Sequence, residues 1–129
     1  MAACVSSSLS PRRPLATATA LGASVAPGTA ASAQARIEGR TFKLLQGEEL
    51  VTAWRHPDGG FEKCFCRECG AHLFSRNPDD PRQMSVRLGA FDGDPGVRPS
   101  WRTFVAYAAA WEAIPDDGLE RFAEGKPRV

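Results

Sequence analysis

Hydrophobic and polar residues alternate most clearly over residues 84–88. Met84, Val86 and Leu88 fall on one side of an extended segment, and Ser85 and Arg87 fall on the other. Successive side chains of a strand point to opposite faces, so this period of two predicts a half-buried β-strand. Segments rich in branched and aromatic residues predict further strands at 41–45, 50–55, 61–65, 72–75 and 104–107.

Turn-forming residues separate these segments. They gather at 47–49, 57–60 and 77–81, and a Gly/Pro/Asp-rich loop covers 92–100. The sequence contains no amphipathic helical pattern, no internal repeat, and no apolar run near the roughly 20 residues that cross a membrane. A chain of 129 residues with this pattern predicts one mainly β domain, which we place at 33–128.

The first 32 residues lack any such periodicity. Ala, Ser, Thr and Gly dominate them, so the segment buries too little apolar surface to offset its ordering entropy, and we predict that it is disordered. An export signal is the alternative, because Arg12 and Arg13 precede a weakly apolar stretch and a small-residue run at 31–35. That stretch has few large aliphatic residues, which counts against a signal.

The overall charge is nearly balanced, with 16 basic and 15 acidic residues. A net charge of +1 does not favour nucleic acid as a partner. Trp54, Trp101 and Trp111 are predicted to pack in the core or at its rim. His56 precedes a Pro-Asp-Gly-Gly turn and is predicted to be exposed.

Three of the four cysteines lie within six residues, whereas Cys4 stands apart. Such a cluster suits a metal knuckle in a reducing compartment, so we expect a cytoplasmic protein. Cys66-Arg-Glu-Cys69 places two thiolates on one bend, and Gly70 supplies the positive φ that the bend needs. We therefore predict Cys66 and Cys69 as zinc ligands. A redox pair is disfavoured, because no helix start follows the motif.

Two neighbours of the knuckle leave an alternative open. Cys64 precedes Cys66 by two residues, which gives a three-thiolate spacing, and His72 could act as a fourth ligand. The simpler interpretation treats Cys64 as an apolar strand residue and His72 as a surface residue. We favour the simpler interpretation, because strands before such knuckles are usually filled with small apolar residues.

A wider series of segments resembles one family. It comprises FKLLQGE at 42–48, GFE at 60–62, FCRECG at 65–70, LFSR at 73–76, VRLGAFDGD at 86–94 and WEAIPDDGL at 111–119. In this order they are similar to the GFA family, the glutathione-dependent formaldehyde-activating enzymes and their centromere-protein-V relatives. The resemblance implies an Mss4-like β fold, two zinc sites, glutathione or a related small thiol adduct as the partner, and carbon–sulfur lyase activity of the S-(hydroxymethyl)glutathione synthase type.

The chain departs from the family where the chemistry lies. The family's catalytic zinc uses an early Cys-x-Cys-x-x-Cys motif, and its structural zinc pairs an early Cys-x-Cys with the later knuckle, here Cys66 and Cys69. Cys4 is the only cysteine before Cys64, so neither early motif is present. No catalytic residue is therefore assigned, and we expect the lyase activity to be absent. A non-catalytic zinc-knuckle binding module is the alternative.

The segment that should hold the missing motif has an unusual property. Read two bases out of frame, codons for residues 15–26 permit RHCHCTRCQRR, which resembles the family's catalytic motif, and codons for 4–11 permit RFELTEP, which resembles its opening strand. From residue 28 the native frame continues smoothly into family-like sequence. We therefore predict two compensating frame errors, one near the start and one at about residues 26–28.

Overall fold

The computed structural model describes residues 6–9, 17–21 and 30–127. Ten strands and four 3-10 turns make up this part of the chain. The strands are β1 (Ser6–Leu9), β2 (Thr17–Leu21), β3 (Ala31–Glu38), β4 (Phe42–Gln46), β5 (Val51–Trp54), β6 (Glu62–Cys66), β7 (His72–Asn77), β8 (Asp80–Arg87), β9 (Pro99–Thr103) and β10 (Glu120–Arg121). The 3-10 turns are η1 (Gly39–Thr41), η2 (Glu48–Leu50), η3 (Leu88–Ala90) and η4 (Val105–Tyr107).

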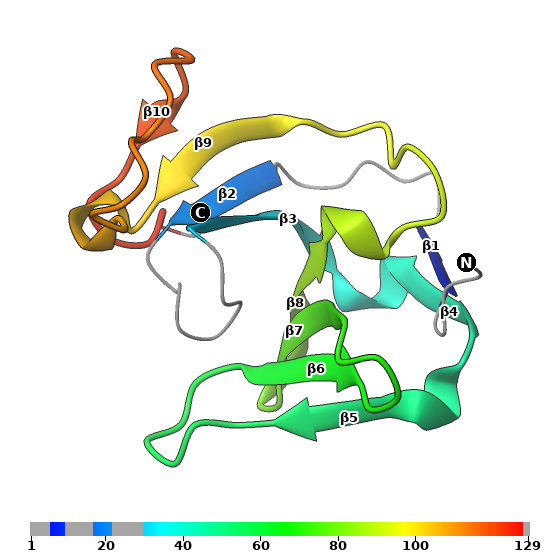
Figure 1. Ribbon diagram of the computed structural model, residues 1–129. Coiled ribbons are helices and arrows are strands. Elements are labelled where there is room, and N and C mark those ends of the chain that lie inside the picture. The colour runs from blue at the N-terminus through cyan, green and yellow to red at the C-terminus, as the bar shows by residue number, and fades with distance from the viewer. Residues whose placement is uncertain (1–5, 10–16, 22–29, 128–129) are drawn as a thin grey trace.

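Eight of these strands form one sheet in the order β10-β9-β2-β3-β8-β7-β6-β5. All neighbours from β2 to β5 in this order are antiparallel, whereas β9 runs parallel to both β2 and β10. The sheet bends, with β9, β2 and β3 above and β7, β6 and β5 below (Figure 1). β1 and β4 pair separately beside it.

The two faces of the central strands differ in chemistry. One face carries the hydrophobic core, in which Cys64, Phe74, Val86 and Ala35 follow one another across β6, β7, β8 and β3. Phe42 of β4 covers this face, and its ring centroid lies 5.2 Å from that of Phe74. The other face is polar. This division explains the alternation at 84–88, because each strand contributes every second side chain to the core.

The prediction of a mainly β fold is confirmed. The strands expected at 41–45, 50–55, 61–65, 72–75 and 84–88 correspond to β4, β5, β6, β7 and β8. The strand expected at 104–107 is wrong. There the chain turns through η4, and Phe104 has a left-handed backbone with φ 58°, while the strand itself lies earlier, as β9. β3 was not predicted.

In the described part of the first 32 residues, β1 and β2 are two short strands where the sequence predicted none, and β3 begins at Ala31. β1 pairs with β4, and β2 lies between β3 and β9, so their backbone groups find partners that no local pattern reveals. The remainder of the predicted disordered or frame-shifted head, including most of the signal-like stretch, lies outside the described residues. Within the described part of the chain, no helix is long and apolar enough to cross a membrane.

Candidate functional site: the cysteine knuckle

The predicted knuckle forms the connection between β6 and β7. The Gly70 N–H donates to the Cys66 carbonyl at 2.7 Å, and the Cys66 N–H donates to the Ala71 carbonyl at 3.0 Å. Gly70 has φ +74°, so the predicted positive φ is confirmed. The Arg67 N–H donates to the Leu50 carbonyl at 2.9 Å, which fixes the bend against the end of η2. Residues 66–70 therefore form a tight turn anchored on both sides.

The three clustered cysteines have different surroundings. Cys64 and Cys66 are buried, with 0% and 1% of their surface exposed, whereas Cys69 is exposed. Cys64 lies in the core against Phe74, and desolvation raises the pKa of its thiol. A thiol whose ionised form is disfavoured is a poor metal ligand, since the thiolate is the species that binds. These surroundings match the interpretation of Cys64 as an apolar strand residue.

The donor set decides how well zinc fits this knuckle. Within the described residues, no group of three or more His, Cys, Asp or Glu side chains comes together. The four-ligand alternative with Cys64, Cys66, Cys69 and His72 is therefore wrong for this fold. A closed tetrahedral zinc site needs four ligands, and the two thiols predicted to bind zinc, Cys66 and Cys69, are half of that number. No cluster among the described residues completes the set, so we derive no chemical step through the metal.

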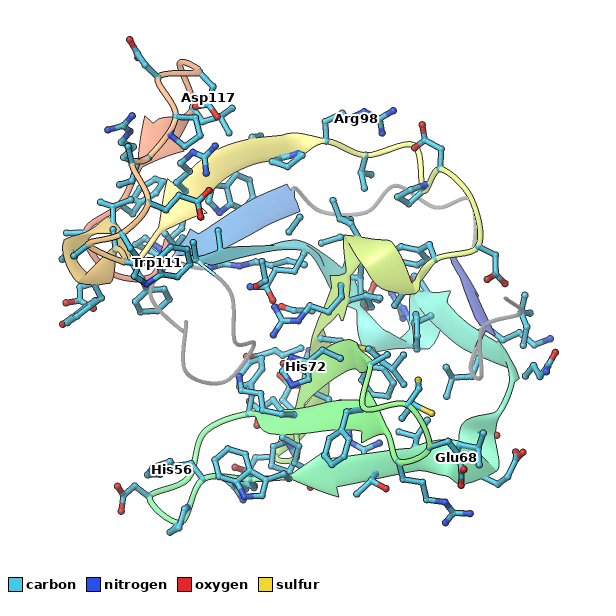
Figure 2. The ribbon with its side chains drawn as sticks, viewed as in Figure 1. His56, Glu68, His72, Arg98, Trp111 and Asp117 are labelled. Atoms are coloured by element: carbon cyan, nitrogen blue, oxygen red, sulfur yellow. The ribbon has the colours of Figure 1, made fainter. Side chains whose placement is uncertain are left out.

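His72 lies apart from the cysteines, in the neighbourhood of Phe65, Arg87 and Lys63. It lies opposite Phe65 at the start of β7, beside a register shift in the β6–β7 pairing. Figure 2 shows its ring on the inner side of the bent sheet. Its Nδ1 atom is buried and has no hydrogen-bond partner among the residues that the structure describes. Burial lowers the pKa of His72, and the nearby positive charges of Arg87 and Lys63 lower it further. The sequence analysis did not identify Lys63 and Arg87 as functional candidates.

The predictions for His56, Trp101 and Trp111 have different outcomes. His56 is exposed, as predicted, and its ring meets Trp54 edge-on at 5.9 Å. Trp101 is buried, with Lys126 Nζ 4.2 Å from its ring centroid. Trp111 was predicted to pack, but 72% of its surface is exposed, and it lies at the periphery (Figure 2).

Two cavities lie away from the knuckle. One, of about 760 Å³, opens between β4 and the apolar face of the sheet, where the Arg76–Glu62 ion pair (2.6 Å) forms part of its wall. The other, of about 310 Å³, lies at Ala31, Arg102 and Glu112. Among the described residues, no cysteine lines either cavity, so the knuckle and the cavities are separate features.

The fold and the knuckle together define a mainly β protein with a Cys-x-x-Cys bend between two strands. Comparison with known families is more specific, because the sequence profile of the glutathione-dependent formaldehyde-activating enzymes matches residues 24–107. The match includes β3 to β9 and the whole knuckle. This chain therefore belongs to the GFA family.

No curated protein matches the chain in sequence. Among solved structures it is similar to a Rhodobacter sphaeroides protein known from a crystal structure, with 20% identity and a TM-score of 0.41. The similarity covers 71% of this chain and 66% of that one.

Proposed function

We propose that this chain is a GFA-family zinc-knuckle protein that, as written, lacks the family's carbon–sulfur lyase turnover. The observation that carries the proposal is the contrast between the family match and the cysteine inventory. The match extends over 24–107, but the only cysteines are Cys4, Cys64, Cys66 and Cys69. The sequence retains the knuckle and lacks the early motif that would hold a catalytic metal.

The proposed metal ligands are Cys66 and Cys69. Structural zinc contributes on the order of 10–16 kcal/mol in small domains when all four ligands are present. Two thiolates supply half of that coordination, so we expect weak zinc binding with exchangeable outer ligands. The reactive thiols of such a knuckle favour a reducing, cytoplasmic setting.

The proposed small-molecule partner is glutathione or its formaldehyde adduct, S-hydroxymethylglutathione. In the family reaction, the thiol sulfur adds to the carbonyl carbon of formaldehyde, or the resulting C–S bond is cleaved. A bound metal would polarise the carbonyl and stabilise the thiolate. Because the donors for that metal are absent from this sequence, we propose that the chain can bind the thiol compound without accelerating the exchange.

The test combines metal analysis with an exchange measurement on the full chain. We expect less than one tightly held zinc per chain by mass spectrometry of the metal, and still less in the Cys66→Ser and Cys69→Ser variants. NMR exchange between glutathione, formaldehyde and their adduct should proceed at the spontaneous rate. Acceleration above that rate would overturn the proposed loss of turnover, and zinc bound equally well by both variants would overturn the ligand assignment.

A further inference from the structure

Three basic side chains gather on the polar face of the sheet, on three neighbouring strands. Lys63 of β6 lies opposite Ser75 of β7, and Ser75 lies opposite Ser85 of β8. Arg87 follows Ser85 by two residues, so it lies on the same face. Lys63 and Arg87 therefore share one face, on the two sides of β7.

His72 completes this group from the strand between them. It lies opposite Phe65, which shares its face with Lys63 because the two are separated by two residues on β6. Figure 2 shows His72 directed to the inside of the bend, towards the strands above. We call Lys63, His72 and Arg87 the basic face. All three side chains are partly buried.

The three side chains of the basic face are close enough to shift the pKa values of their neighbours. Burial lowers the pKa of Lys63 and of His72, and the positive charge of Arg87 lowers both further. Burial also lowers the pKa of Arg87. Among the described residues, no carboxylate raises the pKa of any of the three. Glu62 is next to Lys63 in sequence, but it pairs with Arg76.

Neutral groups hold Arg87 in place. Its Nη1 atom donates to Ser32 Oγ at 2.8 Å and to Gln34 Oε1 at 2.5 Å, both on β3. These bonds orient the guanidinium without neutralising it. Partly buried cations in proteins are normally paired with an acid, because desolvating an uncompensated charge is costly. An oriented cation without a counter-charge is therefore a feature that needs a partner.

Most other arginines of the described chain do have acidic partners. The ion pairs are Arg40–Glu38, Arg55–Asp79, Arg67–Glu68, Arg76–Glu62, Arg82–Asp80, Arg98–Asp94 and Arg102–Asp117. Within the same described residues, neither Lys63 nor Arg87 forms one. The buried Nδ1 atom of His72 also lacks a hydrogen-bond partner. A buried polar atom without a partner calls for an explanation, and a bound ion is one of the recognised explanations.

We propose that Lys63, His72 and Arg87 form a binding site for the carboxylate group of a small molecule. Lys63 and Arg87 supply two positive charges from opposite sides of β7, and His72 presents a ring nitrogen between them. A carboxylate offers oxygens that accept hydrogen bonds from all three. The choice of glutathione, which has two carboxylates, as the molecule that contains the bound carboxylate rests on the proposed function. The proposal of the carboxylate site itself does not rest on that function.

The first experiment measures binding of succinate and of glutathione to the full chain by calorimetry. Both are expected to bind saturably, and inorganic phosphate and potassium chloride of equal ionic strength serve as comparisons. Lys63→Gln and Arg87→Gln should each weaken the Kd about tenfold, the size expected when one charge-assisted hydrogen bond is lost. Arg40→Gln, which removes an exposed arginine, should bind like the parent.

Two controls separate lost binding from lost folding. Lys63→Arg keeps the positive charge and should restore most of the affinity. In the parent chain, the imidazole ¹⁵N signals of His72 should shift when succinate is added, while those of exposed His56 should not. Both measurements report on the carboxylate site directly and require no added zinc.

Several outcomes would overturn the site. The site would be refuted if Lys63→Gln, Arg87→Gln and Arg40→Gln bound succinate with equal affinity, or if potassium chloride reproduced the response. It would also be refuted if phosphate bound and succinate did not, or if the His72 signals did not shift when succinate is added. Succinate binding together with lyase turnover would refute the proposed function and leave the site standing. If succinate does not bind and the zinc results are as expected, the site is refuted and the proposed function stands.

Discussion

At the residue scale, the sequence was informative where the local backbone decides the outcome. Gly70 follows a Cys-x-x-Cys bend and has the positive φ expected of it. His56 precedes a Pro-Asp-Gly-Gly turn and is exposed. Trp111 shows the limit of such reasoning, because its hydrophobic character predicted packing and the structure leaves it exposed. Whether a large side chain is covered depends on segments that are distant in sequence.

His72 should make the folded protein less stable at acid pH. Its pKa lies below the ordinary value of 6.5 because of burial, Arg87 and Lys63. The unfolded chain then binds the proton more readily, so the free energy of unfolding falls as pH drops through about 6.5. His72→Gln should therefore lose less stability than the parent between about pH 7 and pH 5, as measured by urea unfolding.

The matched control for this prediction is His56→Gln, which removes the exposed histidine. His72→Gln should have a smaller pH dependence of stability than His56→Gln over the same interval. If His72→Gln and His56→Gln have the same pH dependence, desolvation of His72 does not contribute to acid sensitivity.

At the scale of elements, strands with a clear period of two or with branched and aromatic residues were predicted, and β3 was not. Ala31, Ala33 and Ala35 dominate β3, and Ile37 is its only branched apolar residue. Its strand conformation comes from pairing with β2 on one side and β8 on the other. Small residues fit there because neighbouring strands cover them, as the complete burial of Ala35 shows.

The approach of η1 to the start of β8 is another contact between elements. A Cβ atom at Gly39 would lie 2.1 Å from the carbonyl oxygen of Pro81, which is backbone and cannot rotate away. Gly39→Ala should lower the free energy of unfolding by about 1–3 kcal/mol, the range for overpacking. Urea unfolding measures this change directly.

Gly89→Ala is the control for this contact. A Cβ atom at Gly89 meets nothing within 4 Å, and its φ is not positive. This variant should have a urea midpoint close to that of the parent. Equal midpoints for Gly39→Ala and Gly89→Ala would show that η1 and β8 are not in such close contact.

At the scale of the whole molecule, the family match and the cysteine inventory disagree in a way that the reading frame can explain. The match begins at residue 24, close to the second predicted frame error and after most of the stretch whose shifted codons permit the catalytic motif. The weak zinc binding proposed for this chain would then result from the altered reading frame. A chain with the frame restored would regain the Cys-x-Cys-x-x-Cys ligands of the catalytic motif, which the shifted codons for residues 15–26 permit.

Sequencing the gene across codons 1–35 tests the frame hypothesis. We expect the shifted codons to encode Cys-x-Cys-x-x-Cys, and a protein expressed with the frame restored to bind about two zincs, as the family pattern implies. Such a protein should also accelerate the glutathione–formaldehyde exchange. Shifted codons that do not encode those cysteines would refute the hypothesis.

The sequence by itself determined the mainly β class, five of the strands, the knuckle bend and the family, because these follow from local periodicity, turn chemistry and ordered motifs. Only the tertiary structure decided that Cys64 lies in the core and that His72 leaves the knuckle. It also decided that Lys63, His72 and Arg87 share one face. The physical reason is that strand pairing and register join residues far apart in the chain, and a change of one residue in register would exchange the two faces of a strand.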